Sequence, residues 1–137
     1  MLLVIDVGNT HTVLGVYEGE KLLHHWRVWT DREKTSDEYG ILIRNLYDGS
    51  HFSSREIHSI AIASVVPPLT PTIVDLCVRY FVITTMVLGP GVKTGISIKM
   101  DNPKDVGADR IVNAVSAFAT HKKACIVVDF GTSTTLE

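Results

Sequence analysis

The sequence predicts an α/β fold built on a mixed β-sheet with helices on both faces. The first observation is that three short segments with strand character crowd into the first thirty residues, and this tight spacing implies an antiparallel meander. The second is that helical and strand-like segments alternate through the rest of the chain. A meander followed by such alternation is typical of a sheet whose later strands are joined by crossing helices.

The strands of the meander follow from apolar runs and turn residues. The first is a continuous apolar run that ends at Asp6, and the Glu18-Gly-Glu20 segment is a hairpin turn signal between the second and the third. In the third strand, alternation puts Trp26 and Val28 on one face. Three strands are therefore expected at 2–5, 12–17 and 22–29.

Three helices and three further strands are expected after the meander. Thr35-Ser-Asp-Glu38 is a capping box, in which side chains satisfy free backbone N–H groups at a helix start. Thr70 is the expected N-cap of the second helix, with Pro71 at its first position, and Asn102-Pro103 is expected to cap the third. Apolar residues at helical spacing support these helices at 39–47, 73–81 and 108–118. The expected strands are 57–66, 85–88 and a buried one at 125–128.

Composition and charge restrict the class of protein. The chain has 137 residues, is 45% hydrophobic and carries a net charge of -2, which excludes a disordered chain and gives no basic surface for nucleic acid or an anionic membrane. No apolar run is long enough to span a membrane, and the N-terminus has no cationic signal-peptide region. Cys77 and Cys125 are expected to be buried, reduced thiols of a cytosolic protein. The histidines show no metal-ligand spacing, and no Cys/His or Ser/His arrangement suggests a nucleophile.

An internal repeat relates the two ends of the chain. Residues 2–10 and 125–133 both consist of an apolar strand followed by Asp-x-Gly and by hydroxyl or amide side chains. The offset of 123 residues (129 − 6) predicts a duplicated domain. We therefore expect a first domain at 1–122, and the first strand and hairpin of a second, truncated domain at 123–137.

The two Asp-x-Gly turns have the chemistry of phosphate loops. Gly8 and Gly131 allow a tight turn and a close approach to a ligand, and the residues after them offer hydroxyl, amide and backbone N–H donors. Asp6 and Asp129, at strand ends, can hold a hydrated cation beside a phosphate. One such turn alone is more simply a β-turn. Two copies are expected to face each other across one cleft as a nucleotide clamp.

These motifs resemble those of the superfamily that contains acetate and sugar kinases, the Hsp70 chaperones and actin, whose two halves are ribonuclease H-like. Within it, the chain is most similar to type III pantothenate kinases. The similarity extends over the whole chain, and Gly107-Ala-Asp-Arg110 with its flanks is the most specific part. Four segments carry it, namely 6–13, 89–95, 101–113 and 128–134.

The resemblance implies ATP-dependent phosphorylation of pantothenate to 4'-phosphopantothenate, the first step of coenzyme A biosynthesis, with Mg²⁺ and a monovalent cation, K⁺ or NH₄⁺. It assigns Asp109 as the base that takes the proton of the attacking hydroxyl, Asp129 to the monovalent cation and Asp6 as a candidate Mg²⁺ ligand. It also implies a cytoplasmic homodimer with no nucleic-acid or membrane partner. The implied ATP and phosphate contacts are Asp6, Val7, Gly8, Asn9, Thr10, His11, Thr12, Val13 and Thr132. The implied pantothenate contacts are Met100, Gly107, Ala108, Asp109 and Arg110.

Departures from the family pattern leave alternatives open. Met100 stands where family members often have tyrosine, which puts one pantothenate contact in question. Asp109 and Arg110 also allow a simpler interpretation as an ion pair on a solvated helix start. Two other functions stay open: a superfamily kinase for another small substrate, and a non-catalytic regulatory homologue. Family chains continue for roughly as many residues again. This segment alone is therefore expected neither to bind ATP tightly nor to phosphorylate pantothenate. Its strand at 125–128 is then expected to be exposed or paired with another chain.

Overall fold

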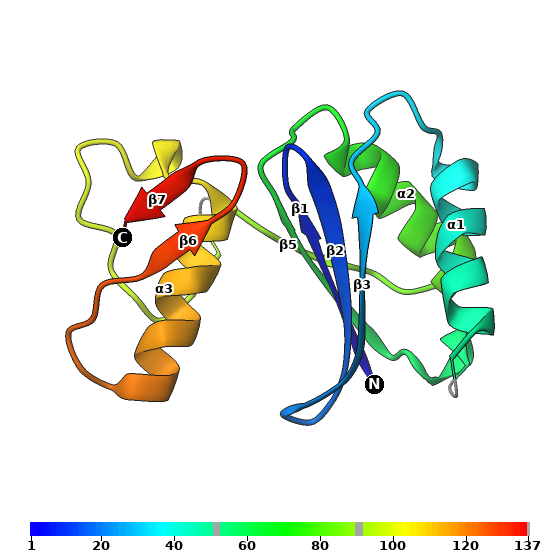
Figure 1. The fold of residues 1–137 in the computed structure, drawn as a ribbon, viewed down its shortest axis with the longest axis horizontal. Helices are drawn as coiled ribbons and strands as arrows, with labels where there is room; N and C mark the ends of the chain where they lie inside the picture. Colours follow the sequence, from blue (N-terminus) through cyan, green and yellow to red (C-terminus); the bar gives the residue numbers. More distant parts are fainter. Residues whose placement is uncertain (51–52, 90–91, 137) are drawn as a thin grey trace.

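A five-stranded mixed sheet is the central element of the fold (Figure 1). The structure is a computed structural model that describes residues 1–50, 53–89 and 92–136. The first three strands form the predicted antiparallel meander, β4 runs parallel to β1, and β5 runs parallel to β4, in the order β3-β2-β1-β4-β5. The strands are β1 (Leu2–Val7), β2 (His11–Glu18), β3 (Lys21–Trp29), β4 (Ser59–Ser64) and β5 (Met86–Leu88).

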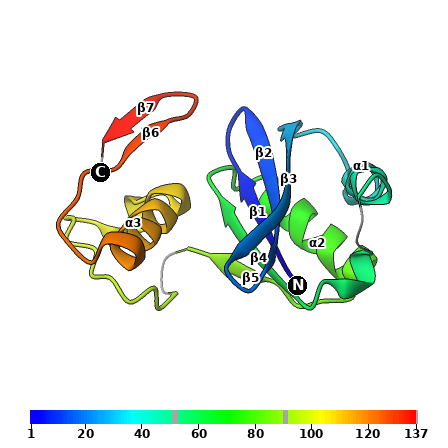
Figure 2. The same cartoon turned by 60° about the horizontal axis from the view of Figure 1, so that its bottom comes forward.

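Helices α1 (Ser36–Asp48) and α2 (Thr70–Phe81) cover one face of this sheet (Figures 1 and 2). The capping box that starts α1 is confirmed, because Thr35 N donates to Glu38 Oε2 at 2.8 Å and Glu38 N donates back to Thr35 Oγ1 at 3.3 Å. The apolar sides of both helices pack on buried side chains of β1, β2 and β4, such as Ile62, and form the core. Burial of these side chains is the main force that holds the layers together.

Helix α3 (Ala108–His121) lies on the opposite side of the sheet, so the predicted arrangement with helices on both faces is confirmed (Figure 2). This helix packs loosely: its buried residues are Ala108 and Ile111, both near its N-terminus. A cavity of about 480 Å³ lies between the helix and the uncovered face of β1 and β4. In the described part of the chain, no helix has the length and apolar character needed to cross a membrane.

The start of α2 differs from the prediction. Its N-cap is Leu69, and Thr70 is already helical, with proline in the first turn as expected. The Thr70 hydroxyl donates to Ser64 Oγ at 2.8 Å instead of capping its own helix. The Thr70-Pro71 pair therefore predicted the first turn of α2 correctly. The hydroxyl of Thr70, however, bonds to the end of β4 and does not cap the helix.

The start of α3 also differs from the prediction. Gly107 is its N-cap, and Asn102-Pro103 leads into a short 3₁₀ turn at Pro103–Asp105. Asparagine and proline favour turns as well as helix starts. The helix begins at Ala108, where the apolar pattern predicted at 108–118 also begins, so only the predicted cap is wrong.

The expected buried strand at 125–128 is wrong in extent and in burial. The strand is β6 (Val128–Phe130), which pairs only with β7 (Thr134–Leu136) in an antiparallel hairpin. Cys125 is exposed, whereas Cys77 is buried as predicted. The apolar run has no layer to pack on, and the side chain of Phe130 is 82% exposed. This agrees with the expectation that the strand is exposed in this segment of chain.

Candidate functional site

Two hairpin loops, 8–10 between β1 and β2 and 131–133 between β6 and β7, face each other across one cleft. The hydroxyl oxygens of Thr10 and Thr132 are 2.7 Å apart and form a hydrogen bond across it. Both loops line the same cavity of about 410 Å³. The prediction that the two Asp-x-Gly turns lie across one cleft is therefore confirmed.

The two turns are not equivalent. Gly8 N donates to His11 O at 3.1 Å, whereas Gly131 N donates to Ser133 O at 3.1 Å, which makes the second turn one residue shorter. A Cβ atom on Gly8 would lie 2.9 Å from His11 O, but a Cβ atom on Gly131 would have an ordinary 3.7 Å contact. Only the first turn therefore requires glycine for space. The expectation that both turns follow buried strands is also wrong for the second, because β6 is largely exposed.

The first loop offers unengaged backbone donors. Two of its carbonyl groups are occupied, because Gly8 O accepts from the Thr30 hydroxyl at 2.8 Å and Thr10 O accepts from Thr30 N at 2.9 Å. Among the residues that the structure describes, none accepts a hydrogen bond from the backbone N–H of Asn9 or Thr10. Arg32 Nη2 donates to Asn9 Oδ1 at 3.0 Å and anchors that side chain. Free N–H groups beside threonine hydroxyls form a suitable cradle for phosphate oxygens.

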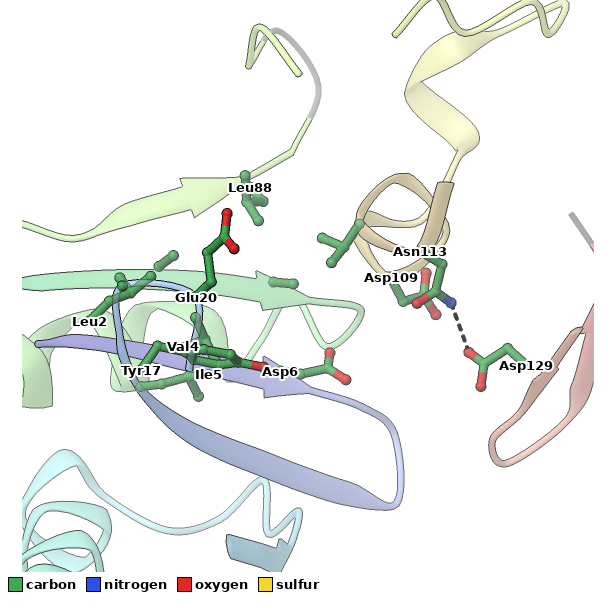
Figure 3. A pocket seen from close by; sticks show the side chains of 14 residues that line it. Leu2, Val4, Ile5, Asp6, Tyr17, Glu20, Leu88, Asp109, Asn113 and Asp129 are labelled. Atoms are coloured by element: carbon green, nitrogen blue, oxygen red, sulfur yellow. Dashed lines mark hydrogen bonds between the residues drawn. The ribbon is translucent and has the colours of Figure 1, made fainter. Parts of the chain in front are cut away.

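Three carboxylates line the cavity beside α3 (Figure 3). Asp6 comes from β1, Asp109 from the first turn of α3 and Asp129 from β6, and all three line both cavities. Asn113, one turn after Asp109 on α3, donates to Asp129 Oδ2 at 3.2 Å. The site therefore brings together three elements that are far apart in the chain.

The pKa of Asp6 is raised above its ordinary value of 3.8. The largest cause is desolvation, because the surrounding protein removes part of the carboxylate's hydration even though the side chain still contacts solvent in the cleft. The negative charges of Asp109 and then of Asp129 raise the pKa further. The site therefore concentrates negative charge that a cation would neutralise.

Most, but not all, of the predicted site residues line the polar cleft. Those that line it are Asp6, Gly8, Asn9, Thr10, His11, Val13, Asp109, Asp129 and Thr132. Val7 and Thr12 are buried, because alternation along β1 and β2 turns them to the other face of the sheet. The remaining residues line neither of the two cavities: Met100, Gly107, Ala108 and Arg110.

Arg27 and Asn113 line these cavities but were missed in the sequence. Strand pairing puts Arg27 in one row with Val13 and Asp6 across the meander, so its side chain faces the cleft. The alternation of β3 was a signal that could have found Arg27. The spacing of four residues from Asp109 could have found Asn113, because such residues share a helix face.

The donor atoms of the site fit hard cations. Within residues 1–50, 53–89 and 92–136, no group of three or more His, Cys, Asp or Glu side chains is arranged to hold a metal ion. Mg²⁺ is often bound through one or two carboxylates together with substrate phosphates and water, so Asp6 beside the loop at 8–10 fits this pattern. Asp129 has an oriented carboxylate, since Asn113 donates to it.

Replacing Asp6 by asparagine is expected to stabilise the ligand-free protein near neutral pH. The raised pKa means that the folded state binds the Asp6 proton more tightly than the unfolded state does. The free energy of unfolding therefore falls as the pH rises from the ordinary value of 3.8 through the raised pKa, and Asp6→Asn removes this loss. Urea unfolding across that pH range, with Asp48→Asn at the exposed last residue of α1 as control, measures the effect. A lower stability of Asp6→Asn than of wild type at neutral pH would contradict the charge argument.

Comparison with known proteins gives one consistent result. Residues 2–137 match the family model described as type III pantothenate kinase. A type III pantothenate kinase of Halalkalibacterium halodurans is 56% identical over 135 residues, which cover 98% of this chain and 53% of the relative. One from Syntrophus aciditrophicus is 56% identical over 137 residues, covering 100% of this chain and 54% of the relative. The chain thus spans about half the length of the curated relatives it matches.

Proposed function

Because this chain belongs to the type III pantothenate kinase family, we propose that its protein transfers the terminal phosphoryl group of ATP to pantothenate, giving 4'-phosphopantothenate. The observation that supports this best is the position of the three carboxylates between two cavities of different character. The hairpin-lined cleft suits the phosphates of a nucleotide, and the apolar cavity beside α3 suits an organic acceptor. Asp6, Asp109 and Asp129 stand where the two substrates would meet.

Asp109 is the proposed catalytic base. It lies in the first turn of α3 and lines both cavities, between the proposed phosphate cleft and the proposed acceptor cavity. Arg110 N donates to Asp109 Oδ1 at 2.8 Å, which fixes the carboxylate against its own helix. From there it would accept the proton of the pantothenate hydroxyl and orient the attacking oxygen toward the phosphorus.

The loop at 8–10 is the proposed site for the phosphates of ATP. The backbone N–H groups of Asn9 and Thr10 would donate to phosphate oxygens, and the hydroxyls of Thr10 and Thr132 would add donors from both sides of the cleft. Arg27 would contribute positive charge from the sheet face that lines the same cleft. Donors fixed in advance around developing negative charge are how phosphoryl transfer is commonly catalysed.

Two cations are proposed for the carboxylates. Asp6 would hold Mg²⁺, which supplies neutralisation of phosphate charge when bound, and Asp129 would hold K⁺ or NH₄⁺ with its carboxylate oriented by Asn113. Crowding of negative charge around Asp6 supports a cation there. The family resemblance alone supports the proposed homodimer and cytoplasmic location.

A coupled assay of ADP release tests the proposed function. The whole protein is incubated with ATP, Mg²⁺ and pantothenate, and the phosphorylated product is identified by mass spectrometry. Turnover that requires another small alcohol would support a superfamily kinase of different specificity. ATP binding by calorimetry without turnover of any acceptor would support a non-catalytic homologue.

Gly107→Ala is expected to lower kcat by about tenfold while the protein remains folded, a loss that corresponds to about 1.4 kcal/mol in the barrier. A Cβ atom at this position would collide with Asp109 Oδ1, so the carboxylate must turn away from its present position. The φ angle of Gly107 is -59°, so alanine introduces no backbone strain. Steady-state kinetics and the unfolding midpoint are measured together. Gly49→Ala is the control, because its Cβ would have only an ordinary contact of 3.7 Å, and equal losses of kcat in both variants would contradict the prediction.

A further inference from the structure

Thr30, the residue after β3, joins the buried interior to the loop at 8–10. Its side chain is 6% exposed, and that of Thr12 is 2% exposed. Their hydroxyl oxygens are 2.9 Å apart, and the Thr30 hydroxyl donates to Gly8 O at 2.8 Å. Among the described residues these two threonines are the buried polar ones apart from tyrosines. Burying a hydroxyl costs free energy unless it is hydrogen-bonded, and these bonds satisfy both threonines while linking them to the backbone of the loop.

The direction of the bonds follows from the number of protons. A carbonyl can only accept, so the single hydroxyl proton of Thr30 goes to Gly8 O. Thr12 must then donate its own hydroxyl proton to Thr30 Oγ1. Both hydrogen bonds are therefore donated in the same direction, from Thr12 to Thr30 and from Thr30 to the loop.

Thr30 controls two peptide planes of the loop. Its hydroxyl holds the carbonyl of Gly8, and its backbone N–H holds the carbonyl of Thr10 at 2.9 Å. No peptide bond of the described residues is cis, so the C=O and N–H of each plane point in opposite directions. Holding Gly8 O therefore also fixes the N–H of Asn9, which donates to no described residue.

We propose that Thr30 is a positioning residue for nucleotide phosphate, whose buried hydroxyl turns the Gly8 carbonyl away from the anion and the Asn9 N–H toward it. This inference rests on the proposed function, because it concerns the same phosphate loop. Without the hydroxyl, the Gly8–Asn9 plane is free to rotate, and a carbonyl oxygen facing a phosphate oxygen is repulsive. The effect acts on ATP and leaves pantothenate, which would lie beside α3, untouched.

The test compares three variants of the whole protein. Thr30→Val removes the hydroxyl at nearly constant volume, Thr30→Ser keeps it, and Thr70→Val is the matched control that removes another partly buried threonine hydroxyl bond, to Ser64 at 2.8 Å. Calorimetry gives the Kd for ATP, steady-state kinetics gives both KM values and kcat, and urea unfolding gives the stability. Thr30→Ala tests the same hydroxyl if Thr30→Val does not fold.

Thr30→Val is expected to raise the Kd and KM for ATP by about tenfold, equivalent to about 1.4 kcal/mol, with the KM for pantothenate unchanged. Thr30→Ser is expected to restore ATP binding, and Thr70→Val to lose stability with no change in ATP binding. An unchanged Kd for ATP in Thr30→Val, or an equal rise in Thr70→Val, would overturn the inference. If the wild-type protein binds ATP but does not phosphorylate pantothenate, the proposed function fails, while the Kd values still decide the role of Thr30.

Discussion

Asp109→Asn is expected to lower kcat for pantothenate phosphorylation by about 10²–10⁴-fold, the usual contribution of a positioned general base. Asparagine has nearly the same shape but cannot take the proton of the attacking hydroxyl. Asp109 lines both cavities from the α3 side, whereas the proposed phosphate donors lie on the two hairpin loops. The Kd for ATP is therefore expected to stay close to that of wild type, or to fall slightly, because one negative charge near the phosphates is removed.

Steady-state kinetics and calorimetry of the whole protein check this result. Asp48→Asn makes the same chemical change at the exposed last residue of α1, which lines neither cavity, and is expected to leave kcat unchanged. A kcat for Asp109→Asn within a few-fold of wild type would show that another group accepts the proton. A loss of ATP binding as large as the loss of kcat would instead place Asp109 on the nucleotide side.

Ile62→Ala is expected to lower the free energy of unfolding by about 2–5 kcal/mol, as large-to-small changes in cores do. Ile62 is fully buried in β4, beside Ile5 of β1, and belongs to the cluster that α1 and α2 cover. The loss combines the removed apolar surface with the cavity that rigid neighbouring strands leave behind. Because β1 and β4 both end at the cleft, this core also supports the site.

Urea unfolding of the 137-residue chain measures the effect. Ile41→Ala is the matched control, because Ile41 lies on α1 with its side chain 56% exposed, and alanine is a better helix former. Its stability is expected to remain within about 0.5 kcal/mol of wild type, as for most surface changes. Equal losses of unfolding free energy in the two variants would contradict the prediction, because a buried strand residue and an exposed helix residue would then contribute equally to stability.

Much of the first part of the fold was predictable from the sequence because its signals are local. The meander needs only apolar runs and a turn between them, and the capping box at Thr35 satisfies its own helix start. The two Asp-x-Gly turns were also readable, and both line the cleft. Such features depend on neighbours within a few residues, so the amino-acid order alone is enough to specify them.

The sequence by itself predicted the two Asp-x-Gly turns that carry Asp6 and Asp129, and the family resemblance added Asp109; all three side chains line both cavities. Only the tertiary structure decided that Gly107, and not Asn102, is the N-cap of α3, and that the apolar run before Val128 stays exposed. Burial depends on whether another layer of the fold covers a segment, and the apolar residues of that segment do not show whether such a layer exists. The positions of Arg27 and Thr30 also depend on contacts distant in sequence, because strand pairing brings each residue beside a loop that lies about twenty residues away in the chain.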